Sequence, residues 1–304
     1  MKTIKQRISY AVMGLITMGF TACTQNEDMA PTLKGQEINA TFTVGGVQTR
    51  VNTLEKGNKW ENDDDLKVLF FTDDYLSESA ILNFDGKTKT WSHSRLFRWK
   101  DDYSTHNILA VHPFNYDFEK YELPLEQKTL PELKSADLIN GYLCQTPNWF
   151  IEIPMRHRMS LVTITYHVGT ADYPNLDIEE LQVYPKSTKV TFKIDQGKKE
   201  ITMNQPGGNP NSDWITACKH DNNQFSAIVI PDSYAADDTF LKFKLGNQSF
   251  NVKMNMDTSF KEGICYTYEL KVGKNKMELT PTSIEDLSGW DSEEELKSYY
   301  VCKR

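Results

Sequence analysis

The sequence lacks the residue patterns of the common catalytic and metal-binding sites. It contains no HExxH motif, no GxSxG motif and no glycine-rich phosphate loop. The six histidines form no cluster at metal-ligand spacing: His93, His106, His112, His157, His167 and His220. We therefore expect no enzyme activity, no catalytic residue, no metal and no cofactor. A carboxylate pair for glycoside hydrolysis would leave no sequence pattern, and nothing in this chain supports one.

Positive charge is scarce as well. The chain has 34 lysine and arginine residues against 42 aspartate and glutamate residues, and its formal net charge is −8. A protein that follows nucleic-acid phosphates would carry a basic stripe, so we expect no nucleic-acid partner. Aspartate runs such as residues 63–65 lack the spacing of an EF-hand loop, and we interpret them as solvated turns.

Long hydrophobic runs are absent apart from residues 8–22, which are too short to span a bilayer. Basic residues precede this run, as in a secretory signal peptide. Residues 20–23 (FTAC) resemble the lipobox of bacterial lipoproteins, with Phe20 where leucine is more usual. The resemblance implies cleavage by signal peptidase II between Ala22 and Cys23 and acylation of Cys23, for example with palmitate. The alternative is a plain signal peptide with an incidental cysteine.

The residues after Cys23 are polar and include Pro31 and Gly35, so we interpret residues 23–36 as a flexible tether. Glu27 and Asp28 resemble the acidic signal that directs lipoproteins to the cell surface in Bacteroidales, although an ordinary linker would look the same. We therefore expect a surface protein held in the outer-membrane lipid through acylated Cys23, since two or more acyl chains give stable anchoring.

Closely spaced cysteines are absent too. Besides Cys23 the chain has four, widely separated and with no CxxC: Cys144, Cys218, Cys265 and Cys302. In an exported protein these four thiols could pair in three ways. They could equally be small buried hydrophobic residues.

Helical patterns of three turns are absent, whereas short alternating runs are frequent. Strands of about five residues, separated by turns every eight to twelve residues, predict an all-β fold built from β-sandwiches. A strand is also predicted at residues 96–99, a loop at 116–131 and a helical turn at 135–142. A new series of strands begins near residue 156. We therefore predict a signal peptide (1–22), a tether (23–36) and two sandwich domains (37–155 and 156–304).

One alternating strand stands out ahead of these domains. Ile38, Ala40, Phe42 and Val44 alternate with polar residues, and Gly45-Gly46 then ends the pattern. Arg50 follows as a candidate site for a trypsin-like protease. Everything downstream is a β-rich region that such a strand could complete. The alternative is a permanent strand with an exposed loop arginine.

Four tryptophans leave another alternative open. A sugar-binding platform could be formed by Trp91, Trp99, Trp149 and Trp214. Sandwich cores use aromatic side chains too, so we favour a core position for each of them.

The order of several motifs resembles the fimbrillin-like proteins, the lipoprotein pilins of Bacteroidales. The matching segments are Thr49-Arg50, Trp60 with residues 63–71 (DDDLKVLFF), 107–113 (NILAVHP), 135–138 (SADL), 156–161 (RHRMSL), 228–231 (IVIP), 260–268 (FKEGICYTY) and 284–290 (IEDLSGW). The family's usual proline-glutamine pair is replaced by Pro231-Asp232.

This resemblance implies two tandem sandwiches of transthyretin-like or Greek-key type and a structural role. In such pilins a protease cuts after an arginine, the first strand leaves, and a strand of a neighbouring subunit takes its place by donor-strand exchange. Carried onto this chain, the leaving strand is residues 38–47 and the cut follows Arg50. We thus expect a pilus subunit, anchor or tip adhesin whose partners are other pilin subunits. The alternative is a non-polymerising surface lipoprotein that binds a host glycan or protein.

Overall fold

Apolar and polar residues alternate along much of the chain, and the computed structural model has strands at most of these runs. The structure describes residues 32–44, 60, 62–72, 75–117, 119–169, 171, 173–174, 176–204, 207–220, 223–273 and 277–286. Leu33–Arg304 forms one of two units. The other, Met1–Thr32, lies outside the described residues except for Thr32.

The described residues form strands and one short helix, which confirms the predicted all-β class. The elements up to residue 157 are β1 (Asn39–Val44), β2 (Asp65–Thr72), β3 (Tyr75–Asp85), β4 (Thr90–His93), β5 (His106–His112), β6 (Lys120–Glu122), α1 (Leu130–Ser135), β7 (Ile139–Gln145) and β8 (Phe150–His157).

The remaining elements are all strands. They are β9 (Ser160–Val168), β10 (Ile178–Val183), β11 (Ser187–Asp195), β12 (Glu200–Met203), β13 (Gly207–Gly208), β14 (Ile215–Thr216), β15 (Cys218–His220), β16 (Gln224–Val229), β17 (Ser233–Tyr234), β18 (Thr239–Leu245), β19 (Gln248–Lys253), β20 (Thr258–Ser259), β21 (Ile264–Val272) and β22 (Met277–Asp286).

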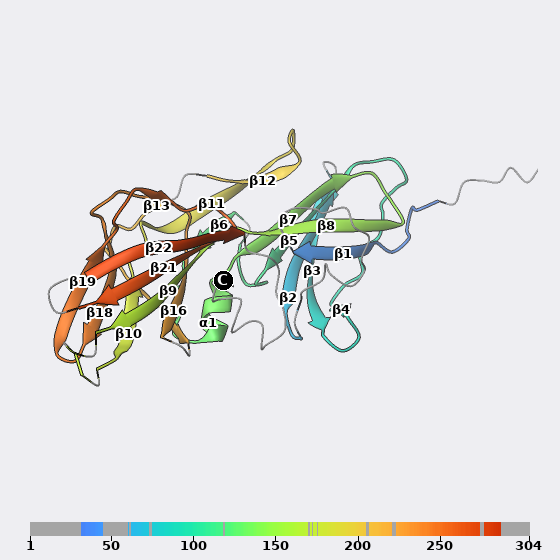
Figure 1. Ribbon diagram of the computed structural model, residues 1–304. Coiled ribbons are helices and arrows are strands. Elements are labelled where there is room, and N and C mark those ends of the chain that lie inside the picture. Colours follow the sequence, from blue (N-terminus) through green and yellow to red (C-terminus); the bar gives the residue numbers. More distant parts are fainter. Residues whose placement is uncertain are drawn as a thin grey trace, which may run out of the picture. The chain divides into compact units, whose positions relative to one another are not determined.

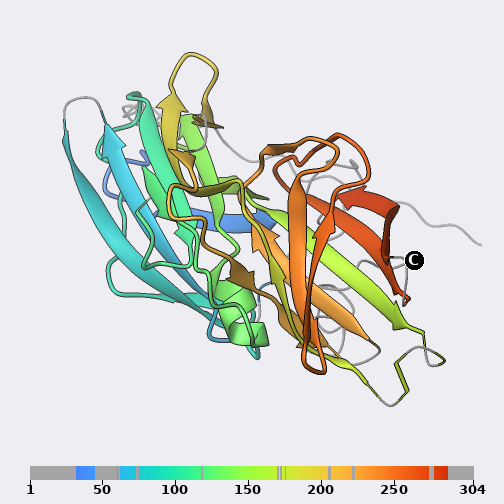
Figure 2. The ribbon, with the colours of Figure 1, turned by 90° about the vertical axis from the view of Figure 1, so that its left-hand side faces the viewer.

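The first sheet has seven strands in the order β1-β8-β7-β5-β2-β3-β4. Its strands, coloured blue to green, lie side by side in Figures 1 and 2. All neighbours are antiparallel except β1 and β8, which run parallel. Buried and more exposed residues alternate strictly along β2 and β8, so each has one face toward the core. Central strand β5 is buried at every position, which requires cover on both faces.

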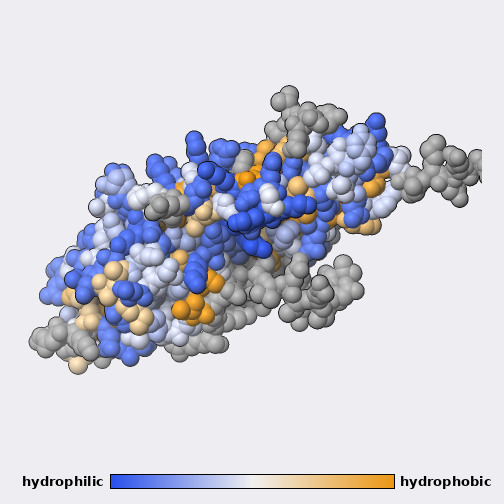
Figure 3. Space-filling model, turned by 90° about the horizontal axis from the view of Figure 1, so that it is seen from above, coloured by the Kyte–Doolittle hydropathy of each residue, from blue (hydrophilic) through white to orange (hydrophobic). Residues whose placement is uncertain are grey.

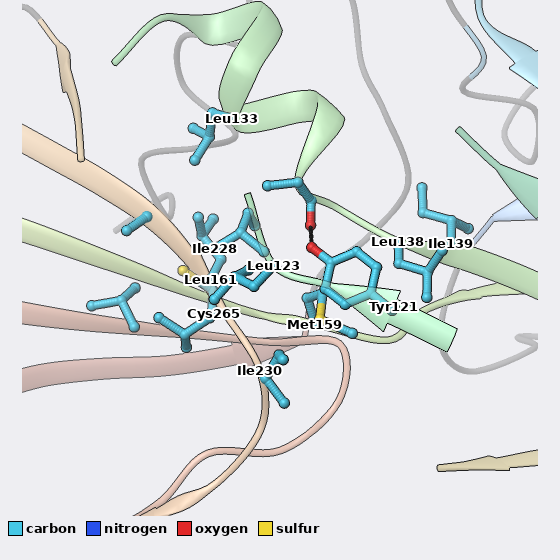
Figure 4. Packing of buried hydrophobic residues seen from close by; sticks show 14 of the residues in the cluster. Tyr121, Leu123, Leu133, Leu138, Ile139, Met159, Leu161, Ile228, Ile230 and Cys265 are labelled. Carbon is cyan, nitrogen blue, oxygen red and sulfur yellow. Dashed lines mark hydrogen bonds between the residues drawn. The ribbon is translucent and has the colours of Figure 1, made fainter. Parts of the chain in front are cut away.

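The strands after residue 157 form two larger sheets, β14-β10-β18-β19 and β15-β16-β9-β21-β22. Within the second of these, β21 runs parallel to β9 and antiparallel to β22. Phe240 of β18 and Tyr268 of β21 have ring centroids 5.7 Å apart, so side chains of the two sheets pack against each other. Figure 4 shows part of the adjoining apolar core, including Leu161, Ile228 and Cys265.

The segment between β5 and β7 joins the second group of sheets. Strand β6 pairs with β11, and the side chain of Gln127 is fully buried beside β16. Its amide oxygen accepts from the backbone N–H of Ile228 at 2.8 Å, and its amide nitrogen donates to the Ile228 carbonyl at 3.0 Å. Gln127 therefore bonds to β16 much as a residue of a neighbouring strand would. The predicted loop at residues 116–131 was wrong in this part, because it contains β6 and the start of α1.

The predicted helical turn at residues 135–142 was also wrong. The helix lies earlier, at Leu130–Ser135, where Thr129 and Glu132 form a reciprocal capping box. Residues 139–145 continue instead as β7, paired to β5 along its whole length. The boundary predicted after Met155 falls inside β8, and the division into two domains remains a prediction.

The face of the molecule in Figure 3 is mostly hydrophilic, with small and separate hydrophobic patches. The described part of the chain contains one helix, α1, which has six residues. No helix in that part is long and apolar enough to cross a membrane.

Gly141 allows β7 to approach β8 closely. A Cβ at this position would lie 2.5 Å from the Pro154 carbonyl oxygen and 2.7 Å from the Met155 sulfur. Replacing Gly141 with alanine should therefore lower the free energy of unfolding by about 2 kcal/mol, because the backbone of β8 must shift. Urea denaturation measures this difference.

Gly208→Ala is the matched control, since a Cβ there would meet nothing within 4 Å. It should change the free energy of unfolding by less than about 0.5 kcal/mol. Equal losses in the two variants would contradict the close approach at Gly141.

Candidate functional site

Strand β1 lies at one edge of the seven-stranded sheet. Phe42 and Val44 are buried, Ile38 and Ala40 are half-buried, and the residues between them are more exposed. The apolar residues that alternate in the sequence are therefore the less exposed residues of the strand. The strand spans Asn39–Val44 within the predicted 38–47, and residues 45–47 lie outside the described residues.

The parallel pairing of β1 with β8 aligns Phe42 with Ile153 and Val44 with Met155. Two threonines on β1 add side-chain contacts to β8. Thr41 Oγ1 donates to the Ile151 carbonyl at 3.3 Å, and Thr43 Oγ1 donates to Glu152 Oε1 at 2.9 Å. Strand β1 is thus held along one side by β8.

The residues just before β1 pair with a different segment. The Gly35 N–H donates to the Trp99 carbonyl, the Trp99 N–H to the Gln36 carbonyl and the Ile38 N–H to the Phe97 carbonyl, at 2.8 to 3.1 Å. Only one bridge, between Glu37 and Arg98, results. The strand predicted at residues 96–99 was therefore wrong, because this segment meets one short stretch of chain rather than a sheet.

Trp60 covers the open edge of β1. Its indole nitrogen donates to the Phe42 carbonyl oxygen at 2.8 Å, and its side chain is buried. Its ring centroid lies 5.2 Å from that of Trp91 and 5.6 Å from that of His112, both in edge-on geometry. Trp60 therefore satisfies a backbone acceptor of an edge strand that β8 does not reach.

His112 lies behind Trp60 among acidic groups. Its Nδ1 is 2.7 Å from the Asp65 carbonyl oxygen and 3.6 Å from Asp65 Oδ1. Burial disfavours the imidazolium, but hydrogen bonds to Asp65 and the charge of Asp64 outweigh this effect and raise the pKa of His112.

A groove with a volume of about 470 Å³ lies between β1 and residues 89–97. Its floor consists of apolar side chains of the seven-stranded sheet: Val68, Phe70, Leu82, Ile108, Ile151 and Ile153. Phe150 at the start of β8 also lines it and is 79% exposed. The groove thus offers apolar surface beside an edge strand.

Four charged or titratable side chains line the groove, and all four are exposed at its mouth: Glu37, Lys89, His93 and Arg95. Among the described lining residues none is a buried acid or base, so the groove supplies no evident proton-transfer pair. It suits the binding of an apolar chain segment, with charged groups at the rim.

A second cluster of polar side chains is buried and brings together three segments singled out in the sequence. His157 Nδ1 lies 2.7 Å from Asp137 Oδ2, and both side chains are at most 2% exposed. Arg158 donates to Asn140 Oδ1 at 2.5 Å and to Glu262 Oε2 at 2.8 Å. His157 is a hydrogen-bonded packing residue. The sequence did not predict its hydrogen bond with Asp137, since nothing in the local pattern joins residues twenty positions apart.

The other predicted site residues are not assembled into one place. Ala22, Cys23 and Arg50 lie outside the described residues. Trp99 is buried and Trp149 is exposed. The remaining two pack in separate contacts, Trp91 against Trp60 and Trp214 against Tyr184. No sugar-binding platform of four tryptophans is formed.

The cysteines differ from one another. Cys144 and Cys218 are free thiols, whereas Cys265 is disulfide-bonded. Burial raises the pKa of the Cys218 thiol to about 11. Among the described residues, no group of three or more His, Cys, Asp or Glu is arranged to hold a metal ion.

Comparison with known proteins gives a family and a fold. A family model described as fimbrillin-like matches residues 49–286, well over half of the chain. A candidate cell adhesion protein from Bacteroides ovatus is 16% identical over 85% of this chain and 99% of its own, with a TM-score of 0.60. Another, from Bacteroides uniformis, is 16% identical over 75% of this chain and 93% of its own, with a TM-score of 0.55. At this identity the two structures share the fold with this chain. No curated protein matches the sequence.

The contact of Trp60 with β1 can be tested by removing its hydrogen bond. Trp60→Phe should lower the free energy of unfolding by about 2 kcal/mol, because the Phe42 carbonyl loses its donor in a buried setting. Amide hydrogen exchange along β1 should quicken. Trp149→Phe, at an exposed site, is the control and should cost less than about 0.5 kcal/mol.

The raised pKa of His112 predicts a pH dependence of stability. The stabilisation that His112 contributes is fully present below its pKa in the unfolded chain, near 6.5. It is lost as the pH rises through its higher pKa in the folded protein. Urea denaturation should therefore show that the free energy of unfolding falls more between pH 6 and pH 8 for the natural chain than for His112→Gln. An identical loss in both proteins would contradict the assignment.

Proposed function

The chain belongs to the fimbrillin-like family, and on this premise we propose that it is a lipid-anchored fimbrial protein that assembles by donor-strand exchange at the β1 groove. Membership makes it a fimbrial-type surface protein and favours a structural role over an enzymatic one. The proposal covers a pilus subunit, an anchor and a tip adhesin. The observation that carries it is the position of β1, an edge strand beside an apolar groove.

Strand β1 is a removable element in energetic terms. It pairs with one neighbour in the sheet, over the six positions Asn39–Val44. Burying Phe42 and Val44 is worth roughly 2 kcal/mol for each side chain. If β1 left, the edge of β8 and both side-chain sites would be open to solvent.

An incoming strand could replace what β1 supplies. Its backbone would pair with β8, and apolar side chains at alternate positions would fill the sites of Phe42 and Val44. This is β-augmentation, for which an exposed sheet edge is the usual template. The donor would therefore be an extended segment with period-two apolar residues, carried by another pilin subunit.

Cleavage after Arg50 would make the exchange feasible. Arg50 lies six positions beyond Val44, the last residue of β1 (50 − 44 = 6). A cut there would leave β1 held only by noncovalent contacts, among them the hydrogen bond from Trp60, which is on the far side of the cut. It would also separate the body of the protein from acylated Cys23 in the outer membrane.

A glycan-binding surface lipoprotein remains the second candidate, and one observation favours it. Trp91 and Phe97 line the groove, and Lys89 and Arg95 stand at its mouth. Aromatic faces with polar groups nearby suit a sugar ring. In that case the groove would bind a host glycan or protein while β1 stayed in place.

The proposal predicts the fate of the anchored protein on exposure to an arginine-specific, trypsin-like protease. Membranes that carry the full chain should release the body after a cut at Arg50, and size-exclusion chromatography should then show oligomers. Arg50→Lys should resist the protease and stay in the membrane fraction. A chain in which a conventional, fully removed signal peptide replaces residues 1–23 should be cut equally well but start in the aqueous fraction, since it lacks acyl chains.

If the trimmed protein stays monomeric at high concentration and is retained on a glycan array, this result would contradict strand exchange. It would support the glycan-binding surface lipoprotein instead. An uncut chain that still joins oligomers would identify an anchor instead.

A further inference from the structure

Strands β1 and β4 are the two edges of the seven-stranded sheet, yet residues of both line the groove (Figure 1). The sheet therefore curls until its edges face each other across the groove. The two sides of the groove touch at two points. The Ile38 N–H donates to the Phe97 carbonyl at 3.0 Å, and the ring centroids of Phe42 and Trp91 lie 5.6 Å apart. Between these two points the groove separates the edges.

Ala40 lies between the two points, and its backbone faces the groove. Successive residues of a strand turn their N–H and C=O groups to opposite sides. The Phe42 carbonyl points away from β8, because it accepts from Trp60, and so does the Ile38 N–H, which bonds to Phe97. The N–H and C=O of Ala40 point the same way, two residues from each. Among the described residues neither group has a hydrogen-bond partner, so β1 offers a free donor and a free acceptor here.

The floor and the mouth of the groove define the chemistry of its ligand. The floor residues named above are all apolar, so a sugar ring would find no hydrogen-bond partner there. At the mouth Lys89 and Arg95 face a single acid, Glu37, beside His93. Arg95 also lies 3.6 Å from Glu78, an acid that a second lysine contacts. Acidic groups on a ligand therefore complement this mouth.

We propose that the groove is a docking site for an extended peptide segment of an acidic partner protein. The segment adds to β1 as a further strand of the sheet while β1 stays in place. Its backbone bonds to Ala40, its apolar side chains lie on the floor at alternate positions, and its acidic side chains lie beside Lys89 and Arg95. This inference builds on the second candidate function and requires neither cleavage nor strand exchange.

A peptide probe tests the docking on the natural, uncut full chain reconstituted in phosphatidylcholine vesicles. The probe is Glu-Val-Thr-Val-Thr-Val-Glu with blocked ends and a fluorescent label. We expect saturable binding by fluorescence anisotropy, which empty vesicles should not show. An absence of binding would overturn the proposal. If the protein is then retained on a glycan array, the second candidate function would stand with a sugar as its ligand.

Two N-methylated forms of the probe test whether its backbone bonds to β1. In an extended peptide the valine N–H groups face one side and the threonine N–H groups face the other. One form is methylated at the valines and the other at the threonines. The form that loses the donors facing Ala40 should bind about tenfold more weakly than the probe. If both forms bind as tightly as the probe, strand addition is contradicted.

Ala40→Pro removes the matching donor from the protein. The lost N–H faces the groove rather than β8, and proline is tolerated on an edge strand where its nitrogen faces away from the ladder. The affinity for the probe should fall about fivefold. An unchanged affinity would place the probe elsewhere on the protein and overturn the proposal.

Reversing one charge tests the mouth of the groove. Lys89→Glu should weaken probe binding about threefold, because it places a like charge beside a glutamate of the probe. Lys87→Glu is the matched control, since Lys87 is exposed and does not line the groove, and it should change the affinity little. Equal losses in the two variants would reduce the effect to net charge and contradict the contact at the mouth.

Hydrogen exchange separates docking from strand exchange. The amides of residues 38–44 should exchange more slowly when the probe is bound, because β1 gains a second neighbour. Faster exchange of this segment would mean that the probe displaces β1, which would overturn docking and support strand exchange. Unchanged exchange would place the probe outside the groove and also overturn the proposal.

Discussion

The pairing of β1 with β8 is the interaction on which the groove depends. Without it the sheet would end at β8, and the floor of Val68, Phe70 and Ile153 would lack a wall on that side. A parallel pair needs a long connection between its strands. Here that connection is nearly the whole first sheet, so β1 can be the last strand to join a body that is already folded around β8.

Buried polar partners set the second constraint. His157 with Asp137, and Arg158 with Asn140 and Glu262, lie where β7, β8 and β9 meet. Buried polar groups are costly unless each finds a hydrogen-bond partner. These contacts tie the end of the first sheet to the turn before β21, and a change at one of them would leave a buried polar group without its hydrogen bond.

Alternation along the chain predicted the class of fold and strands such as β2 and β8, because one face of each is buried. It failed at β7, where Asn140 and Gly141 are buried as well and the period disappears. It also missed α1, although Thr129, Pro131 and Glu132 carry a helix-start signal. Strand β1 was predictable from residues 38–44. The groove was not, since it depends on contacts distant in sequence, such as Trp60 with Phe42.

The pairing of β6 with β11, and the bonds of Gln127 to Ile228, have a consequence for stiffness. A hinge near residue 156 would allow the first sheet to swivel against the sheets that follow it. Such a swivel would pull β6 and Gln127 away from their partners and leave buried donors and acceptors unsatisfied. The connection between the two groups of sheets is therefore stiff. Tension applied to one group would reach the other with little bending between them.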